Sequence, residues 1–70
     1  MVANVGKLRG KIAENGYNNR AFAKAMDMSE ITLRRKINEA DYEFTIGESI
    51  TARELLGLTV EEYLDIFINF

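Results

Sequence analysis

The side chains of this chain that can make specific contacts lie close together, between residues 19 and 38. They include three consecutive basic residues, Arg34, Arg35 and Lys36, with short polar side chains just before them. Such groups donate hydrogen bonds and pair with anions, which is the chemistry of binding. The chain has no His and no Cys, and its carboxylates are spaced as helix-surface residues rather than as a convergent pocket. The sequence therefore predicts a binding protein and not an enzyme, with no metal and no cofactor.

The charges are unevenly distributed along the chain, although the net charge is only −2. Residues 1–36 contain eight Lys and Arg against three acidic residues, whereas residues 37–70 contain Arg53 and eight acidic residues. The local field, rather than the net charge, governs the encounter with a polyanion. Charge asymmetry between two halves therefore points to nucleic-acid contact, with the basic half docking and the acidic half facing away.

The 70 residues predict one domain over 1–70, stabilised by a well-packed core, by a second chain or by both. A hydrophobic fraction of 47% makes such a core credible. No stretch approaches the roughly 18 consecutive apolar residues of a membrane span. Lys7, Arg9 and Lys11 interrupt any apolar secretory signal near the N-terminus. We therefore expect a cytoplasmic protein without a membrane or a small-molecule ligand as partner.

Turn and capping residues predict five helices, which makes the expected fold all-α. An apolar i, i+3, i+7 pattern precedes Gly16, which indicates a first helix that ends there. Asn18 or Asn19 can cap the second helix, and Ser29 can cap a third that runs to about Asn38.

The second half of the chain predicts the last two helices. Thr45 with Glu48 is a capping-box pair, Gly57 closes the helix that this pair opens, and Thr59 with Glu62 repeats the device. The alternative for residues 42–46 is a short extended segment.

Residues 17–38 have the pattern of two short helices that cross steeply over a tight turn. The small Ala23 suits a close crossing, and Asp27 tolerates the unusual backbone angle that such a turn requires. Met28 would plug the turn. The apolar residues that would hold the two helices together are Phe22, Met26, Leu33 and Ile37.

This segment and the residues after it resemble the helix-turn-helix domains of phage repressors and Cro-like regulators. The ordered motifs are Gly16-Tyr17-Asn18-Asn19, Ser29-Glu30-Ile31-Thr32-Leu33, Lys36-Ile37-Asn38, Glu43-Phe44-Thr45 and Leu55-Leu56-Gly57-Leu58-Thr59. The resemblance covers nearly the whole chain and implies a five-helix, lambda repressor-like domain with a helix-turn-helix in helices two and three. It also implies a Cro-like repressor of a phage or mobile element, whose third helix lies in the major groove of double-stranded DNA.

The resemblance, with the chemistry of the side chains, assigns ten residues to DNA contact. They are Asn19, Arg20, Ser29, Glu30, Ile31, Thr32, Arg34, Arg35, Lys36 and Asn38. Arg35 can pair with a guanine edge, Glu30 can accept from a cytosine amino group, and Ile31 can meet a thymine methyl. The side chains suited to the phosphate backbone are those of Asn19, Arg20, Ser29, Lys36 and Asn38.

Some residues depart from the family pattern. Asp27 replaces the usual turn glycine, Glu39 stands where glycine often follows Asn38, and the loop over residues 39–44 carries three acidic residues that repel phosphate. The simpler interpretation of residues 34–36 is a solvated helix face, and that of Asn19 and Asn38 is local capping.

The last helix is predicted to have two apolar faces. They are Val60, Leu64, Phe67 and Ile68 on one side and Tyr63, Ile66 and Phe70 on the other. If one face closes the core, the other is left as a partner surface. We expect a homodimer through this helix on a palindromic operator, with a tail wrapped on its own domain as the alternative. The acidic second half leaves a second function open, a protein-interaction module on the same scaffold, such as an anti-repressor or adaptor.

Overall fold

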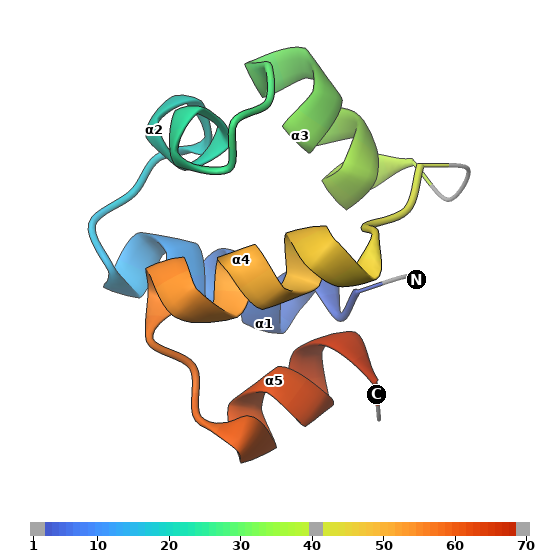
Figure 1. The fold of residues 1–70 in the computed structure, drawn as a ribbon. Helices are drawn as coiled ribbons and strands as arrows, with labels where there is room; N and C mark the ends of the chain where they lie inside the picture. The colour runs from blue at the N-terminus through green and yellow to red at the C-terminus, as the bar shows by residue number, and fades with distance from the viewer. Residues whose placement is uncertain (1–2, 40–41, 69–70) are drawn as a thin grey trace.

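The computed structural model describes residues 3–39 and 42–68, which form helices joined by short connections (Figure 1). The five helices are α1 (Val5–Glu14), α2 (Asn19–Ala25), α3 (Glu30–Asn38), α4 (Ile46–Leu56) and α5 (Val60–Phe67). The described residues contain no strand, so the all-α prediction is confirmed. None of the described helices is both long and apolar enough to cross a membrane.

The predicted caps begin the helices. Asn18, rather than Asn19, caps α2, because its side chain accepts a hydrogen bond from the Ala21 N–H at 2.7 Å. Ser29 caps α3 by accepting from the Thr32 N–H at 3.0 Å. Such a cap contributes about 1 kcal/mol. Both capping boxes are complete, Thr45 with Glu48 at α4 and Thr59 with Glu62 at α5.

Residues with positive φ end α1 and α4 and turn the chain after α2. Gly16 has φ 79° and Gly57 has φ 60°, as expected for helix ends without a β-carbon. Asp27, with φ 59°, is the one non-glycine residue of this kind in the described part of the chain. It lies where the sequence predicts an unusual backbone angle. The chain passes from α2 to α3 within a few residues, and the Met28 N–H donates to the Ala23 carbonyl at 3.0 Å.

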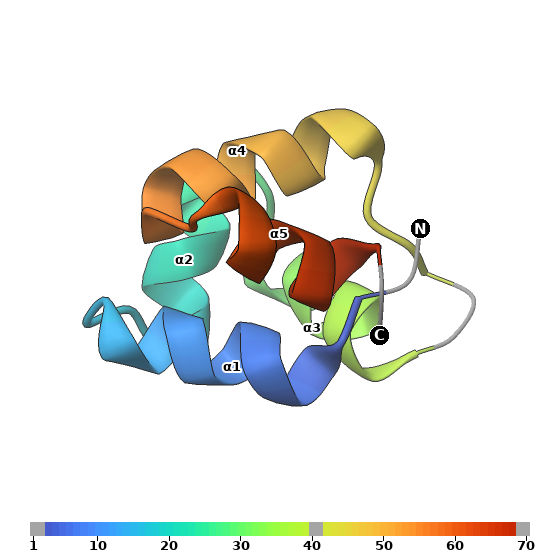
Figure 2. The same ribbon diagram turned by 90° about the horizontal axis from the view of Figure 1, so that it is seen from below.

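The helices form three tiers. α1 and α4 make the middle tier and run in the same general direction, one behind the other in Figure 1, with α2 and α3 above them and α5 below. Figure 2 looks from the α5 side and shows this helix lying over the space between α1 and α4. In Figure 1 α2 is seen almost along its axis whereas α3 lies across the view, so these two packed helices cross steeply.

A single apolar cluster lies between the tiers. From the upper tier it receives the residues that the sequence predicts: Phe22, Ala23, Met26, Leu33 and Ile37, all at most 7% exposed. Burying a large apolar side chain contributes about 1.5–3 kcal/mol, so this packing holds α3 from its inner side. The other buried apolar residues are Ala3, Leu8, Ile12, Phe44, Ala52, Leu56, Leu58, Ile66 and Phe67.

The prediction of two separate apolar faces on α5 is wrong. Ile66 and Phe67, which were expected on different faces, are both buried, and Tyr63 packs against the same cluster. Positions three and four residues apart share one side of a helix, and this side includes 63, 66 and 67. The exposed apolar residues here are Val60, which begins α5, and Ile68, which follows its last residue, while Phe70 lies outside the described residues.

A polar contact accompanies this packing of α5. The hydroxyls of Ser49 on α4 and Tyr63 on α5 are 2.7 Å apart, and the Ser49 hydroxyl also donates to the Ile46 carbonyl at 2.7 Å. Ser49 is completely buried. The position of α4 therefore decides which side of α5 turns inward, and that information is not contained in the pattern of α5 itself.

Candidate nucleic-acid interface

The outer face of α3, defined here as Glu30, Ile31, Arg34 and Arg35, points away from the core. Leu33 turns inward and is fully buried, whereas Ile31 is 63% exposed and both arginines are exposed. The helical repeat explains the division, since positions three and four residues apart share one side. The structure therefore brings the predicted base-reading residues together on one exposed face.

The hydroxyls at the start of α3 bond to each other and to the helix backbone. The Ser29 Oγ donates to the Thr32 Oγ1 at 2.8 Å and also accepts from the Thr32 N–H. Next to them, the Glu30 Oε2 lies 3.8 Å from the Arg34 Nε. Both members of this ion pair are substantially exposed, so the pair is weak. A ligand can separate Glu30 from Arg34 at small cost.

Arg35 is held by an aromatic ring from the loop that follows α3. Its Cζ lies 5.3 Å from the centroid of the Tyr42 ring, and its Nη1 donates to the Tyr42 hydroxyl at 3.3 Å. A guanidinium over an aromatic face is attracted by the ring quadrupole. The end of this side chain is therefore oriented within the free protein.

Lys36 is directed into the protein and does not join the outer face of α3. Its Nζ donates to the Glu43 carbonyl at 2.8 Å and lies 3.0 Å from the Glu48 Oε1, and its side chain is only 13% exposed. Burial raises the pKa of Glu48, but the hydrogen bond from the Thr45 N–H and the Lys36 ammonium outweigh it and lower that pKa. The ion pair fastens the end of α3 to the start of α4.

The other predicted phosphate-binding residues lie at the two ends of the helix pair. Asn19 and Arg20, in the first turn of α2, are exposed. Asn38 ends α3, and its side-chain oxygen accepts a hydrogen bond from the Arg9 Nη2 of α1. Asn19 and Arg20 are thus accessible to a ligand, whereas the Asn38 side chain links α3 to α1.

An open hollow of about 480 Å³ lies beside the turn between α2 and α3. Arg20 and Lys24 line it from α2, and Asp27, Ser29 and Glu30 line it from the turn and the start of α3. Arg20 and Lys24 are one helical turn apart and share a side of α2. In the described part of the chain neither of these two cations forms an ion pair. They supply basic charge next to the outer face of α3.

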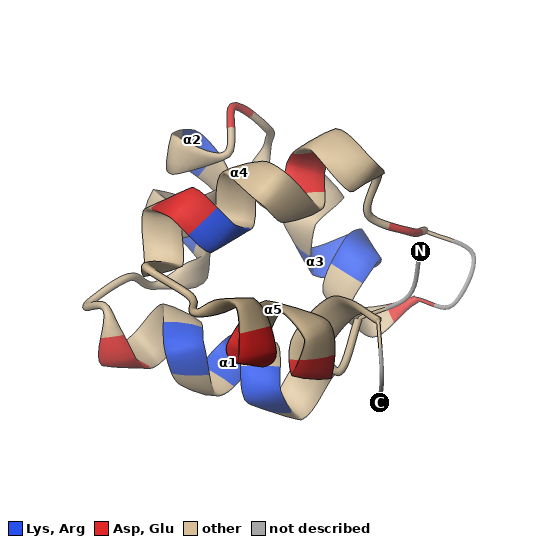
Figure 3. Ribbon diagram, turned by 60° about the horizontal axis from the view of Figure 1, so that its bottom comes forward, with Lys and Arg blue, Asp and Glu red and all other residues tan. Residues whose placement is uncertain are grey.

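Two of the three basic residues of α1, Lys7 and Lys11, are paired with acidic residues, most of them on α5. Figure 3 shows the Lys and Arg positions of α1 facing Asp and Glu positions of α5. The Lys7 Nζ lies 3.9 Å from the Asp65 Oδ2, and Lys11 forms ion pairs with both Glu62 and Glu14. Much of the positive charge counted in residues 1–36 is therefore neutralised within the protein.

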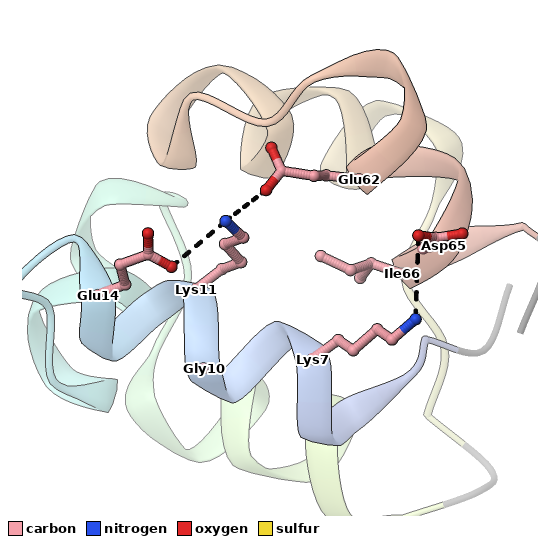
Figure 4. A pocket seen from close by; sticks show the side chains of 7 residues that line it. All are labelled: Lys7, Gly10, Lys11, Glu14, Glu62, Asp65 and Ile66. Atoms are coloured by element: carbon pink, nitrogen blue, oxygen red, sulfur yellow. Dashed lines mark ion pairs between the residues drawn. The ribbon is translucent and has the colours of Figure 1, made fainter.

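These pairs close over a hollow of about 300 Å³ between α1 and α5 (Figure 4). The hydrogen bond from Lys11 is the main cause that lowers the pKa of Glu62 to about 2, followed by the hydrogen bond from the Thr59 N–H. The same contact raises the pKa of Lys11. The charged groups around this hollow pair with one another and so link α1 to α5. The exposed Lys7–Asp65 pair is the weaker of the two pairs that join these helices.

Two residues near the outer face of α3 were missed by the sequence analysis. Lys24 could have been found, because it follows Arg20 by four residues on a predicted helix. Tyr42 could not, since its contact with Arg35 depends on the path of the chain after α3.

No family model, curated protein or solved structure matches this chain. Within residues 3–39 and 42–68, no group of three or more His, Cys, Asp or Glu side chains is placed to hold a metal ion. The function therefore has to be argued from the geometry and chemistry of the site.

Proposed function

We propose that this protein is a cytoplasmic, sequence-specific DNA-binding regulator, a Cro-like repressor that inserts α3 into the major groove. The observation that carries the proposal is the exposed outer face of α3. The major groove, about 12 Å wide, admits one α-helix. Ile31 supports the assignment, because a side chain that is 63% exposed gains apolar contact when it meets a thymine methyl.

In this proposal α2 and α3 are the two helices of a helix-turn-helix within a lambda repressor-like domain. Their steep crossing, the tight turn at Asp27 and the nearly complete burial of Ala23 support it. In a helix-turn-helix the first helix crosses the DNA backbone while the second lies in the groove, and contacts with phosphates fix the register. α2 carries exposed Asn19 and Arg20 at the end suited to that task.

Arg35 is the proposed reader of guanine, through two parallel hydrogen bonds to the base edge. Ile31 would contact thymine, and Glu30 would accept from a cytosine amino group after leaving Arg34. Arg34 would then be released toward a phosphate or a base. Ser29 and Thr32 would contribute hydroxyl groups at the start of α3.

The proposed phosphate contacts are Asn19, Arg20 and Lys24. Lys24 is added to the proposed phosphate contacts because it lies beside Arg20 on α2. Lys36 is not included, because its ammonium is bound by the Glu43 carbonyl and the Glu48 carboxylate. Phosphate contacts set the register without reading sequence.

A homodimer is part of the proposal, since a palindromic operator presents two half-sites about 34 Å apart. We assign the contact to the exposed apolar residues at the two ends of α5, Val60 and the C-cap residue Ile68. Sedimentation equilibrium is expected to give a dimer for the wild type and a folded monomer for Val60→Glu. An unchanged dimer in the variant would place the interface elsewhere, and a monomeric wild type at all concentrations would exclude the homodimer.

Selection of binding sites from a random pool of duplex DNA tests the function directly. We expect a palindromic consensus, and we expect Arg35→Ala to weaken binding to it by about 1–3 kcal/mol, roughly 5- to 150-fold. Discrimination should relax at one base pair of each half-site. Fluorescence anisotropy at fixed salt measures both effects.

Arg53→Ala is the matched control, because Arg53 is an exposed arginine on α4 that stacks on Tyr63 of α5. It should bind DNA like the wild type. If the wild-type protein binds no duplex even at low salt, the DNA-binding proposal is wrong. The protein-interaction module, an anti-repressor or adaptor, would then be the better account.

A further inference from the structure

Tyr42 makes two contacts with the guanidinium of Arg35, and they are of different kinds. The ring lies under the Arg35 Cζ at 5.3 Å from its centroid, and the hydroxyl accepts from the Arg35 Nη1 at 3.3 Å. The contact with the ring limits where the guanidinium can lie, and the hydrogen bond to the hydroxyl limits how it is oriented. One residue supplies both constraints.

The backbone at Tyr42 and at the two residues after it is held by several contacts. The Tyr42 N–H donates to the Glu39 carbonyl at 3.1 Å. Two residues further on, Phe44 is 1% exposed in the core and packs against Phe67. The Lys36 ammonium bonds to the carbonyl of the intervening Glu43. These contacts fix the position of the Tyr42 backbone relative to α3 and the core.

The contact leaves Arg35 able to bind a ligand. A guanidinium carries five N–H donors, and the Tyr42 hydroxyl uses one of them. A bidentate pair with guanine requires two. Tyr42 and Arg35 are both exposed, so the protein does not enclose the guanidinium.

We propose that Tyr42 is a positioning residue that orients the guanidinium of Arg35 for base recognition, a role that rests on the proposed DNA-binding function. A long side chain that is already ordered loses less freedom when it binds, which strengthens specific contacts. Binding to unrelated sequences does not benefit, because phosphates accept a flexible arginine equally well.

The experiment compares wild type, Tyr42→Phe and Tyr42→Ala on the selected duplex, on that duplex with the guanine pair replaced, and on unrelated DNA. Tyr42→Ala is expected to weaken specific binding about 3- to 10-fold and to lower discrimination at the guanine pair. Binding to unrelated DNA should stay unchanged. Tyr42→Phe keeps the ring but lacks the hydroxyl, so its specific binding should lie between that of the wild type and that of Tyr42→Ala.

Double variants identify the residue through which Tyr42 acts. In an Arg35→Ala background, Tyr42→Ala is expected to have no further effect, whereas in an Arg34→Ala background the full effect should persist. Relaxation of the Arg35 side-chain Nε, measured by NMR without DNA, should show greater mobility in Tyr42→Ala than in the wild type. Circular dichroism confirms that each variant is folded.

Three outcomes would overturn the role of Tyr42. If Tyr42→Ala bound DNA as tightly as the wild type, the contact would have no role in binding. If it bound more tightly, Tyr42 would be holding Arg35 away from the DNA. An equal loss in the Arg35→Ala background would make Tyr42 a contact of its own. Failure of the DNA-binding function appears elsewhere, in a wild type that selects no site. Normal binding by Arg35→Ala would instead remove Arg35 from the reading role.

Discussion

The two basic regions of the molecule, α1 and the α2–α3 pair, both carry a net positive charge but differ in what surrounds them. On α1, Lys7 and Lys11 reach acidic residues of α5, at an interface that closes part of the fold. On α2, Arg20 and Lys24 border an open hollow and form no ion pair within the described residues. A count of basic residues therefore overstates the charge that is available to a ligand.

The same contrast occurs within α3. Arg34 and Arg35 stay on the exposed side, whereas Lys36, the next residue, is bound to the start of α4. One step along a helix rotates a side chain by about 100°, so neighbours in a basic run face different surroundings. The side chains of Arg34 and Arg35 therefore point to solvent, and that of Lys36 points into the protein.

The largest expected effect tests the division between the inner and outer sides of α3. Leu33→Ala removes a fully buried side chain and should lower the free energy of unfolding by about 2–5 kcal/mol, a large part of the stability of a small domain. Ile31→Ala, two residues earlier on the exposed side, should change it by less than about 0.5 kcal/mol. Urea denaturation followed by circular dichroism measures both, and equal losses would contradict the division.

The next effect separates a bound lysine from an available one. Lys36→Met should lower the free energy of unfolding by about 1–2 kcal/mol, because it removes a charged hydrogen bond that is largely shielded from solvent. Lys24→Met should leave stability nearly unchanged but reduce the salt dependence of DNA binding by about one phosphate contact. If the salt slope fell with Lys36→Met instead, the assignment of the two lysines would be reversed.

The smallest effect concerns the α1–α5 interface and depends on pH. A carboxyl whose folded pKa is lowered stabilises the protein above its unfolded pKa and loses that contribution as the pH falls. For Glu62 the loss should occur between pH 4.5 and about 2. Glu62→Gln can keep the capping hydrogen bond with Thr59. Its melting temperature should be lower than that of the wild type at pH 7, and it should fall less than that of the wild type over this acidic range.

Glu61→Gln is the control for this experiment, since Glu61 is exposed and forms no ion pair within residues 3–39 and 42–68. It should follow the wild-type curve. DNA binding at neutral pH should be unaffected by either variant, because neither Glu61 nor Glu62 is among the residues proposed to contact DNA or to form the dimer contact. A loss of binding in Glu62→Gln would contradict the separation of the two regions.

Most of the helix boundaries could be predicted, because caps and turns act over three or four residues. Ser29, Thr45 and Thr59 cap helices as expected, and Asp27 takes the left-handed conformation that the turn requires. The side of α3 that turns inward was also predictable, since Leu33 and Ile37 are apolar and the residues between them are polar. These features need only local bonding and the helical repeat.

The inner side of α5 and the partners of individual charges could not be predicted in the same way. α5 is apolar on much of its surface, so its own pattern did not choose between Val60 and Ile66. Arg35 and Lys36 are adjacent basic residues in one charged run, yet Arg35 contacts Tyr42 and Lys36 is bound to Glu48. Each outcome depends on which element lies opposite.

The amino-acid sequence by itself thus determined where the helices begin and end and which face of α3 is polar, because these follow from interactions between near neighbours in the chain. Only the tertiary structure decided which charges remain available and which apolar residues of α5 are buried. Pairing and burial depend on distances in space between residues that are far apart in the chain, and a linear pattern does not encode those distances.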